Sequence, residues 1–465
     1  MGRAWGLVGG VVVAVVSAVP VGAEPAPPVV PGPVVGDVTE VHDPTMVRER
    51  GWWYVLSTNG GMGIRRSADL VHWSLVGQVF PDGTPDWVRD RLPDVPPDNA
   101  WAPDLSYRDG RWWLYWSVAD FGTRRAVTGL MTNATLDPAS PDYRWVDEGL
   151  VLATDDTSPT AAIDANAVTD EHGDQWLAWG SFWDGIFVRR VDPATGNFMT
   201  GAAAVNIARR KEWWQGVEGS FLVHRDGWWW LVASYGFCCH GVDSTYSVHV
   251  GRSRSLTGPY VDAAGRPLLE GGGTTLLGSY GDVVGPGHGS VVPVEGQLVF
   301  VHHYYDRGNG GVPALSIRQL LWGPDGWPVA VDPGFVQVTP TASAVGGQWR
   351  LTNHPQECVS RDRIDATLTL RADGTVSPDG RWRIDGDVLR IESAGRSWWL
   401  YVSDDAGFGR DDRTAAVRGQ RTDGTEADGV ATTLCSPAPP TGPGPKPEGP
   451  PPPAIPIVEP PPTTG

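Results

Sequence analysis

Four acidic side chains and one histidine recur at similar places in five repeated segments of this sequence. Carboxyl groups that face one another can act as a general acid and a general base. Burying so many charged groups is costly unless they are paired or used. Asp and Glu are more often surface turn residues, so their shared place in the repeats carries the argument for a site. The five residues are Asp43, Asp104, Asp164, Glu218 and His288.

The repeats that must position these residues each contain a short strand, a turn centred on glycine and an aromatic-rich strand. The turn glycines, which are 59, 63, 54 and 69 residues apart, are Gly51, Gly110, Gly173, Gly227 and Gly296. The aromatic-rich strands are expected at residues 52–56, 112–116, 176–179, 228–231 and 298–301. A loose repeat of short strands predicts an all-β fold, a five-bladed β-propeller with one repeat per blade. Because the first strand of each blade lines the central channel, the five polar residues are predicted to face one another there.

Composition supports an all-β fold and excludes some partners. The chain of 465 residues has 60 Gly, 42 Pro and 24 Trp, and only 19% of its residues are charged. A turn-rich, aromatic composition of this kind is typical of short strands joined by tight turns. The formal net charge of −18 argues against nucleic acid and against a membrane surface as partners.

The sequence predicts five segments. Residues 1–23 are typical of a secretory signal peptide, with Arg3 before the apolar stretch 7–19 and the small residues 21–23 at the cleavage site. The apolar stretch is short for a membrane span. A Pro-rich leader at 24–35, a propeller domain at 36–340, a C-terminal β-domain at 341–436 and a tail at 437–465 follow. The tail has 14 prolines in 29 residues and is predicted to lack a core.

The C-terminal domain is predicted to be a small β-barrel or sandwich, and its function stays open between a structural cap and polysaccharide binding. Strands are expected at residues 348–351, 367–370, 382–384, 388–391 and 398–401, with hairpin turns at 379–380 and 385–386. Cys358 and Cys435 are predicted to form a bridge, but four cysteines allow three pairings and the sequence does not choose among them. The adjacent Cys238 and Cys239 lack the spacing of zinc ligands, and both a vicinal disulfide and two thiols remain open.

Eight short motifs resemble those of the family 43 glycoside hydrolases, and most closely the endo-1,5-α-L-arabinanases of that family. The resemblance covers roughly residues 36–335 and rests on the order and spacing of the motifs together. The motifs lie at residues 42–44 (His-Asp-Pro), 101–104 (Trp-Ala-Pro-Asp), 121–122 (Phe-Gly), 163–164 (Ile-Asp), 180–183 (Gly-Ser-Phe-Trp), 218–220 (Glu-Gly-Ser), 238–246 (Cys-Cys-His-Gly-Val-Asp-Ser-Thr-Tyr) and 285–288 (Gly-Pro-Gly-His). Members of this family are five-bladed propellers that act on arabinans and xylans.

The resemblance implies a role for each axial residue. Asp43 is expected to be the general base and Glu218 the general acid, while Asp164 raises the pKa of Glu218 and orients it. The family inverts configuration, and the two carboxyl groups of an inverting pair stand ~6.5–9.5 Å apart. His288 is expected to help hold a calcium ion with water in the channel. Calcium prefers oxygen ligands, so a sodium ion or an ordered water stays open there.

A second set of residues is expected to contact the substrate. An indole can stack on the apolar C–H face of a sugar ring. For Trp101 two roles stay open, which are substrate contact and packing between the blades. The tryptophans Trp112, Trp113 and Trp116 alternate along one strand and are predicted to fill the space between blades. The expected substrate-binding residues are Asp43, Trp101, Phe121, Gly122, Asp164, Ser181, Phe182 and Trp183.

The resulting prediction is a secreted, extracellular, monomeric hydrolase that cleaves α-1,5-L-arabinofuranosyl linkages of plant cell-wall arabinan by endo action. Two alternatives are retained. One is an exo-acting α-L-arabinofuranosidase or β-xylosidase of the same family, which an assay on linear polymer against aryl glycoside would separate. The other is a non-catalytic sugar-binding propeller, which a missing axial carboxylate would favour.

Overall fold

The protein was analysed as a computed structural model. It describes residues 32–331 apart from 59, 213 and 214, and after these residues 333, 337–338, 347–353, 363–377, 379–393, 396–403 and 415–421. The predicted signal peptide, the predicted tail and both Cys358 and Cys435 lie outside the described residues. Among the described residues, no helix is long and apolar enough to cross a membrane.

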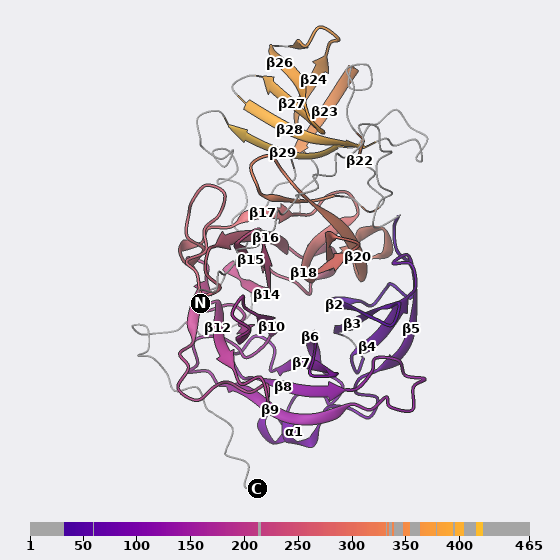
Figure 1. Ribbon diagram of the computed structural model, residues 1–465, viewed down its shortest axis with the longest axis vertical. Coiled ribbons are helices and arrows are strands. Elements are labelled where there is room, and N and C mark those ends of the chain that lie inside the picture. Colours follow the sequence, from indigo (N-terminus) through magenta and orange to yellow (C-terminus); the bar gives the residue numbers. More distant parts are fainter. Residues whose placement is uncertain are drawn as a thin grey trace, which may run out of the picture.

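Five antiparallel sheets are arranged around a central axis, which confirms the predicted five-bladed propeller (Figure 1). Blade one contains β2 (His42–Glu49), β3 (Trp52–Thr58), β4 (Gly63–Ser67) and β5 (His72–Gln78), and blade two contains β6 (Trp101–Arg108), β7 (Arg111–Ala119), β8 (Ala126–Asn133) and β9 (Val146–Thr154). Blade three contains β10 (Asn166–Thr169), β11 (Gln175–Trp179), β12 (Ile186–Val191) and β13 (Val205–Ala208). Blade four contains β14 (Val217–Arg225), β15 (Trp228–Tyr235), β16 (Ser247–Ser253) and β17 (Thr274–Leu277), and blade five contains β18 (Val283–Val294), β19 (Gln297–Asp306), β20 (Val312–Trp322) and β21 (Pro328–Ala330).

The predicted glycine turns join the first and second strands of every blade. Each of the five turn glycines has a positive φ, between 71° and 89°. In four of the turns the preceding residue also has a positive φ, and two such residues in succession make the type I′ turn that matches the twist of a hairpin. The preceding residues are Arg50, Asp109, Asp226 and Glu295. All five predicted aromatic-rich strands are present, within β3, β7, β11, β15 and β19.

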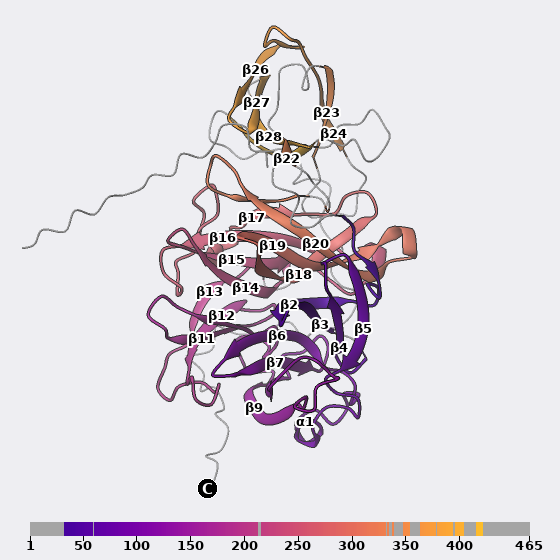
Figure 2. The same ribbon diagram turned by 45° about the vertical axis from the view of Figure 1, so that its right-hand side comes forward.

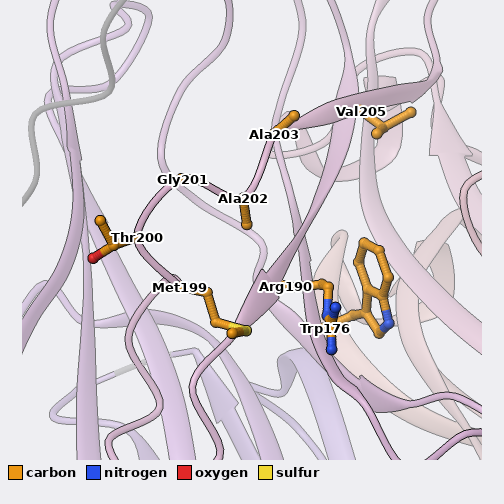
Figure 3. A pocket seen from close by; sticks show the side chains of 8 residues that line it. All are labelled: Trp176, Arg190, Met199, Thr200, Gly201, Ala202, Ala203 and Val205. Carbon is orange, nitrogen blue, oxygen red and sulfur yellow. The ribbon is translucent and has the colours of Figure 1, made fainter.

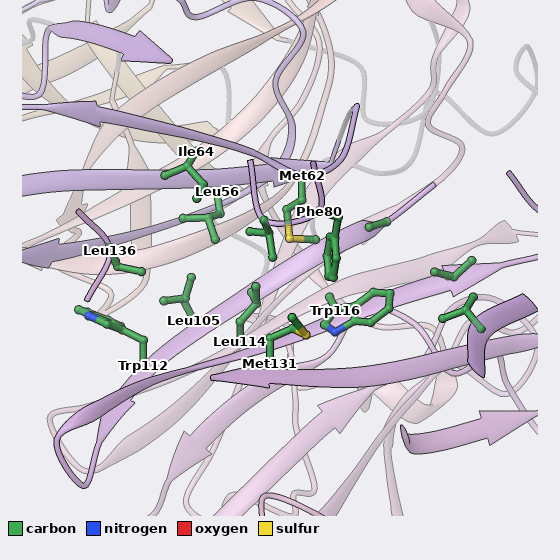
Figure 4. Packing of buried hydrophobic residues seen from close by; sticks show 14 of the residues in the cluster. Leu56, Met62, Ile64, Phe80, Leu105, Trp112, Leu114, Trp116, Met131 and Leu136 are labelled. Atoms are coloured by element: carbon green, nitrogen blue, oxygen red, sulfur yellow. The ribbon is translucent and has the colours of Figure 1, made fainter. Parts of the chain in front are cut away.

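Aromatic side chains fill the space between neighbouring blades, as predicted. Successive residues of a strand point to opposite faces, so one strand serves two interfaces. Trp112 and Trp116 of β7 pack with Leu56 and Phe80 of blade one (Figure 4), whereas Trp113 packs with residues of blade three. Similar apolar clusters lie between blades three and four, four and five, and five and one.

The N-terminal segment ties the last blade to the first. Strand β1 (Val35–Gly36) pairs in parallel with β5 of blade one, so the boundary predicted at residue 36 lies within this strand. Farther along, the backbone N–H of Val41 donates to Pro313 O, and the N–H of Leu315 donates to Val38 O. Pro313 and Leu315 belong to β20 of blade five. Backbone pairing therefore closes the ring at the seam between blades five and one.

The C-terminal β-domain stands on the blade-five side of the propeller (Figures 1 and 2). One sheet has the order β22–β28–β27–β26 with β29 on β28, and a second has the order β23–β24–β25. The strands are β22 (Gln337–Val338), β23 (Gly347–Asn353), β24 (Arg363–Leu370), β25 (Val376–Ser377), β26 (Gly380–Asp385), β27 (Val388–Ser393), β28 (Arg396–Ser403) and β29 (Ala415–Arg421). All five predicted strands are present. The hairpin turn at Asp385–Gly386 is confirmed. Near Asp379–Gly380 the chain passes from the second sheet to the first, and an isolated antiparallel bridge joins Thr375 to Arg381.

Candidate active site

Three of the five predicted axial residues meet directly in the channel. His288 Nδ1 lies 3.2 Å from Asp43 Oδ1 and 3.8 Å from Asp164 Oδ2. All three residues have positive φ values, of 47° for Asp43, 61° for Asp164 and 32° for His288. Asp, Asn and His are the non-glycine residues that adopt this conformation most readily. Strained backbone of this kind tends to occur at functional sites.

Each blade has one residue with left-handed backbone at an equivalent position on its inner side, and we call this the common position. It corrects the alignment of the five repeats that the sequence suggested. In blades two and four it is occupied by Ala102, with φ 49°, and Gly219, with φ 59°. A β-bulge accompanies it in blades one, two, four and five. A Cβ atom on Gly219 would lie 2.9 Å from His288 Cγ, so glycine is required there by close approach. Glu218 therefore precedes the common position by one residue, and Asp104 follows it by two.

Asp104 consequently forms hydrogen bonds from blade two to blade three, and it is not among the residues that contact His288 directly. Its carboxylate accepts hydrogen bonds from Asn166 Nδ2 at 2.9 Å and from the backbone N–H of Ala167 at 2.8 Å. Asn166 and Ser290 lie two residues after the common position in blades three and five, and they make the same kind of contact. Leu222 N–H donates to Asn166 Oδ1, and Met46 N–H donates to Ser290 Oγ. Each bond satisfies an N–H of the innermost strand in the next blade, which would otherwise be unpaired.

Glu218 is held by two hydroxyl groups from neighbouring segments. Ser181 Oγ donates to Oε2 and Tyr246 OH donates to Oε1, both at 2.5 Å. Ser181 is itself fixed, because its backbone N–H donates to Thr160 Oγ1 at 3.0 Å. Ser181, expected at the substrate, is buried and uses its hydroxyl on Glu218.

Asp43 is held by a different set of groups. Thr58 Oγ1 donates to Oδ2 at 2.7 Å, and His42 Nδ1 lies 2.8 Å from Oδ1. The backbone N–H of Asp43 donates to His303 Nδ1 at 3.1 Å. Oδ1 thus faces the imidazoles of His42 and His288, whereas Thr58 is the one described hydrogen-bond partner of Oδ2.

The environments of Asp43 and Glu218 move their pKa values in opposite directions. Burial favours a higher pKa for Asp43, but the imidazoles of His42 and His288 outweigh it and hold the pKa well below its usual value. Burial raises the pKa of Glu218, and the hydrogen bonds from Ser181 and Tyr246 oppose this only in part. A pair of carboxyls with divergent pKa values supplies one ionised base and one protonated acid.

Asp164 and His288 complete the charge distribution. Burial raises the pKa of Asp164 to about 7, and the charges of Glu218 and Asp43 act in the same direction. Burial would lower the pKa of His288, but the carboxylates of Asp43 and Asp164 raise it to about 9. Asp164 Oδ2 also accepts the backbone N–H of Gly219 at 2.9 Å, so it contacts the residue next to Glu218.

Several of the expected substrate-binding residues form an aromatic surface. Phe121 is 71% exposed and meets Trp101 edge to face, with ring centroids 6.2 Å apart. Trp101 is half-buried and its Nε1 donates to Asn99 Oδ1 at 2.8 Å. Gly122 follows with φ 83° and open space around its Cα. An exposed aromatic ring that packs on a half-buried indole is suited to a ligand with apolar C–H faces.

The remaining two lie on a neighbouring loop. Phe182 and Trp183 both have positive φ values, of 53° and 41°. Phe182 packs against Phe237, with centroids 5.5 Å apart, and the guanidinium of Arg124 lies 5.5 Å from the ring centroid of Trp183. The loop therefore joins the segment that carries Ser181 to the one that carries Cys238 and Cys239.

The described residues around His288 do not form a calcium cage. Calcium takes six to eight oxygen ligands. Two groups of three possible metal ligands occur among the described residues, and His288 belongs to neither. One group comprises His42, Cys238 and Cys239, whose sulfurs are joined in a disulfide. The other comprises His42, Asp43 and His303, whose close contacts are the hydrogen bonds given above.

Sequence reasoning missed the residues that surround the two carboxyls, which are His42, Thr58, Tyr246 and His303, and also Tyr305, which bonds His42. His42 is the neighbour of Asp43 in the chain and had no role assigned. The strongest missed signal is at residues 302–305, where His-His-Tyr-Tyr interrupts an otherwise apolar second strand. The other four blades have apolar or small residues through most of this strand.

A hollow of about 310 Å³ lies on blade three, away from these carboxyls (Figure 3). Trp176 of β11 and Arg190 of β12 are cross-strand neighbours at one side of it, and the segment 199–203 forms the other. Its lining shares no residue with the group around His288.

Comparisons with known proteins agree with this geometry. A model of the glycosyl hydrolases family 43 matches residues 33–328. The extracellular endo-α-(1→5)-L-arabinanase 1 of Bacillus subtilis is 36% identical over 293 residues, which is 62% of this chain and 87% of that protein. The extracellular exo-α-(1→5)-L-arabinofuranosidase ArbA of Cellvibrio japonicus is 36% identical over 300 residues, which is 62% of this chain and 86% of that protein.

Solved structures give the same result. The structure of Cellvibrio cellulosa α-L-arabinanase complexed with arabinohexaose superposes with a TM-score of 0.61 at 34% identity, covering 63% of this chain and 96% of that one. An endo-1,5-α-L-arabinanase from Thermotoga petrophila superposes with a TM-score of 0.72 over 84% of this chain and 98% of that one. Its identity is 19%, so this likeness concerns the fold alone.

Proposed function

The chain belongs to glycosyl hydrolase family 43, and from that premise we propose that it is a secreted endo-arabinanase. In this proposal it cleaves α-1,5-L-arabinofuranosyl linkages of arabinan with inversion of configuration. The observation that carries the proposal is the pair of buried carboxyls with opposite pKa shifts, Asp43 and Glu218, in one channel. The relatives named as arabinanases support the substrate, and those named as extracellular support secretion together with the predicted signal peptide.

In the proposed reaction Asp43 is the general base. Its lowered pKa keeps it ionised, and Oδ2, with Thr58 as its described partner, keeps a lone pair for a water proton. As the water oxygen forms its bond to the anomeric carbon, its proton passes to Asp43. Because attack and departure take place on opposite faces of the sugar, the configuration inverts.

Glu218 is the general acid in this scheme. Burial raises its pKa, which favours the protonated form that an acid needs. That proton passes to the glycosidic oxygen as the bond to the anomeric carbon breaks, and Glu218 is reprotonated from solvent in the next cycle. Asp164 is proposed to orient this region, through the N–H of Gly219, and to add to the electrostatic control of Glu218.

An ion at His288 is part of the proposal as a structural element. We propose calcium, with His288 as the single protein ligand and water for the rest, while sodium or water alone remains the alternative. A cation there would offset the negative charge of Asp43 and Asp164. The reaction steps above use only side chains of this chain and substrate water.

Exo action is the second candidate, because the Cellvibrio japonicus relative named as an exo-arabinofuranosidase is as similar as the Bacillus subtilis endo-arabinanase. A time course on debranched arabinan separates the two. Endo action lowers the polymer size early and releases a range of oligosaccharides. Release of a single short product from chain ends, with polymer size unchanged at low conversion, would reject the endo assignment.

A further inference from the structure

A chain of hydrogen bonds joins the carboxylate of Asp43 to the Cys238–Cys239 disulfide. The backbone N–H of Cys239 donates to Tyr305 OH at 2.6 Å. The Tyr305 hydroxyl is 2.7 Å from His42 Nε2, and His42 Nδ1 is 2.8 Å from Asp43 Oδ1. Each link is within hydrogen-bond distance, and the groups come from three different blades.

The first donor favours one direction for the chain. A backbone N–H can only donate, so the Tyr305 oxygen accepts from Cys239 and can donate its own proton to His42 Nε2. With Nε2 as acceptor, the ring proton of His42 is on Nδ1, and Nδ1–H donates to Asp43 Oδ1. In this arrangement the chain holds one histidine tautomer and presents a donor to the carboxylate.

The interior members of this chain have little freedom to move. His42 stacks on His303 with ring centroids 3.7 Å apart and an interplanar angle of 21°. Tyr305 is only 3% exposed. In contrast Cys239 is exposed. The outer end is thus the part of the chain that the solvent can reach.

The disulfide determines where the outer donor points. Cys239 has a φ of 69°, a conformation that L residues other than Asn, Asp and His rarely adopt. Cys238 and Cys239 are joined through their sulfurs, which closes a small ring that includes the peptide bond between them. Opening that ring would let Cys239 return to negative φ, and its N–H would then turn away from Tyr305.

We propose that Tyr305 and the Cys238–Cys239 disulfide are positioning elements that orient the general base Asp43 through His42. This inference rests on the proposed function, because it takes Asp43 to be the base. It predicts that reduction of the disulfide lowers the turnover of the enzyme. With a trialkylphosphine, the S–S bond breaks, phosphorus gains the oxygen of one water molecule to become a phosphine oxide, and the two hydrogens of that water give two thiols.

The test measures kcat and KM on a linear arabino-oligosaccharide for four proteins, each with and without a trialkylphosphine. In Tyr305→Phe the hydroxyl is lost, and kcat is expected to fall roughly 10- to 100-fold with KM unchanged, since misplacement of about 1 Å can cost that much. Reduction of the unsubstituted enzyme should lower kcat by a similar factor. Reduction of Tyr305→Phe should cause no further loss, because its chain is already broken.

Tyr235→Phe is the matched control. Tyr235 is 4% exposed and its hydroxyl donates to Gly272 O at 2.6 Å, in blade four and outside the chain of bonds. This variant should lose stability, keep its kcat and remain sensitive to reduction. In a Cys238→Ser/Cys239→Ser variant, reductant can act only on the remaining cysteines. Any change in its kcat with reductant is subtracted from the change seen in the unsubstituted enzyme.

Unchanged kcat in Tyr305→Phe, or an equal effect of reductant in Tyr305→Phe and the unsubstituted enzyme, would overturn the proposal. If Tyr305→Phe does not fold, reduction of the unsubstituted enzyme decides alone, and full reduction with unchanged kcat overturns it. Asp43→Asn is assayed in parallel. An inactive Asp43→Asn beside a fully active Tyr305→Phe rejects only the positioning role, whereas an active Asp43→Asn rejects the proposed function itself.

Discussion

His288 and Asp43 meet across the seam between the last blade and the first, with Nδ1 3.2 Å from Oδ1. The contact joins residues from opposite ends of the propeller sequence at the place where the backbone also closes the ring. The imidazole lowers the pKa of Asp43, and Asp43 in turn raises that of His288. The contact that sets the ionisation of the proposed base therefore lies at the seam where backbone pairing closes the ring.

Asp104 is expected to make the free energy of unfolding depend on pH between its unfolded and its native pKa. Burial raises its pKa from 3.8 to about 6, so the native state holds this proton more tightly than the unfolded chain does. The stabilisation is complete below pH 3.8 and is lost as the pH rises to about 6, by up to about 3 kcal/mol. The free energy of unfolding of the unsubstituted enzyme minus that of Asp104→Asn should fall across this window. A difference that stays constant from pH 4 to 7 would contradict the assignment.

Ser181→Ala should change the pH profile of activity. The Ser181 hydroxyl stabilises the ionised form of Glu218, so its loss raises the pKa of Glu218 further. The basic limb of the kcat profile is then expected to move to higher pH, while kcat falls by less than the ~10²-fold typical for loss of general acid catalysis. Tyr260→Phe, a buried tyrosine bonded to Leu256 O, serves as the control and should leave the profile in place. Movement of the basic limb to lower pH would argue against Glu218 as the acid.

Removal of an ion tests the role of His288. If calcium binds there, EDTA should lower the Tm of the unsubstituted enzyme, because an ion that binds only the native state stabilises it. His288→Ala should fold, with lower activity and a lower Tm, and EDTA should not lower its Tm further. An unchanged Tm with EDTA, together with no bound calcium by elemental analysis, would reject calcium and leave sodium or water.

The aromatic surface makes a separate prediction about binding. Phe121 is 71% exposed, so Phe121→Ala should cost little stability. If its ring contacts the sugar, KM for linear arabinan should rise while kcat changes less. Phe221→Ala, at a half-buried position on blade four, is a comparison for general loss of apolar surface. Equal KM values for Phe121→Ala and the unsubstituted enzyme would remove Phe121 from the substrate surface.

The blades were predictable from the sequence because their signals are local. The turn at Arg50–Gly51 and the strand that begins at Trp52 are determined by residues a few positions apart, and the same pattern recurs in the other blades. The roles of Asp43 and Glu218 were proposed from the order of the motifs and the resemblance to a known family, and they stay predictions.

The misplacement of Asp104 has a physical cause. One β-bulge decides which residue of an inner strand turns toward the centre, and its position depends on pairing with the next strand and cannot be read from the inner strand alone. The contacts of Glu218 with Ser181 and Tyr246 were likewise missed, because they join segments from different blades. The pair of histidines at 302–303 is a local signal in the sequence, but it was not used.

The assignment of base and acid is tested most directly by two variants on two substrates. An acid is needed only when the leaving group is poor, whereas a base that activates water is needed whatever leaves. Glu218→Ala should thus be nearly inactive on arabinan and partly active on a dinitrophenyl arabino-oligosaccharide, a rescue within the ~10²–10⁴-fold range of general acid–base assistance. Asp43→Asn should be nearly inactive on both substrates. If Asp43→Asn instead kept activity on the dinitrophenyl substrate and Glu218→Ala did not, the two roles would be reversed.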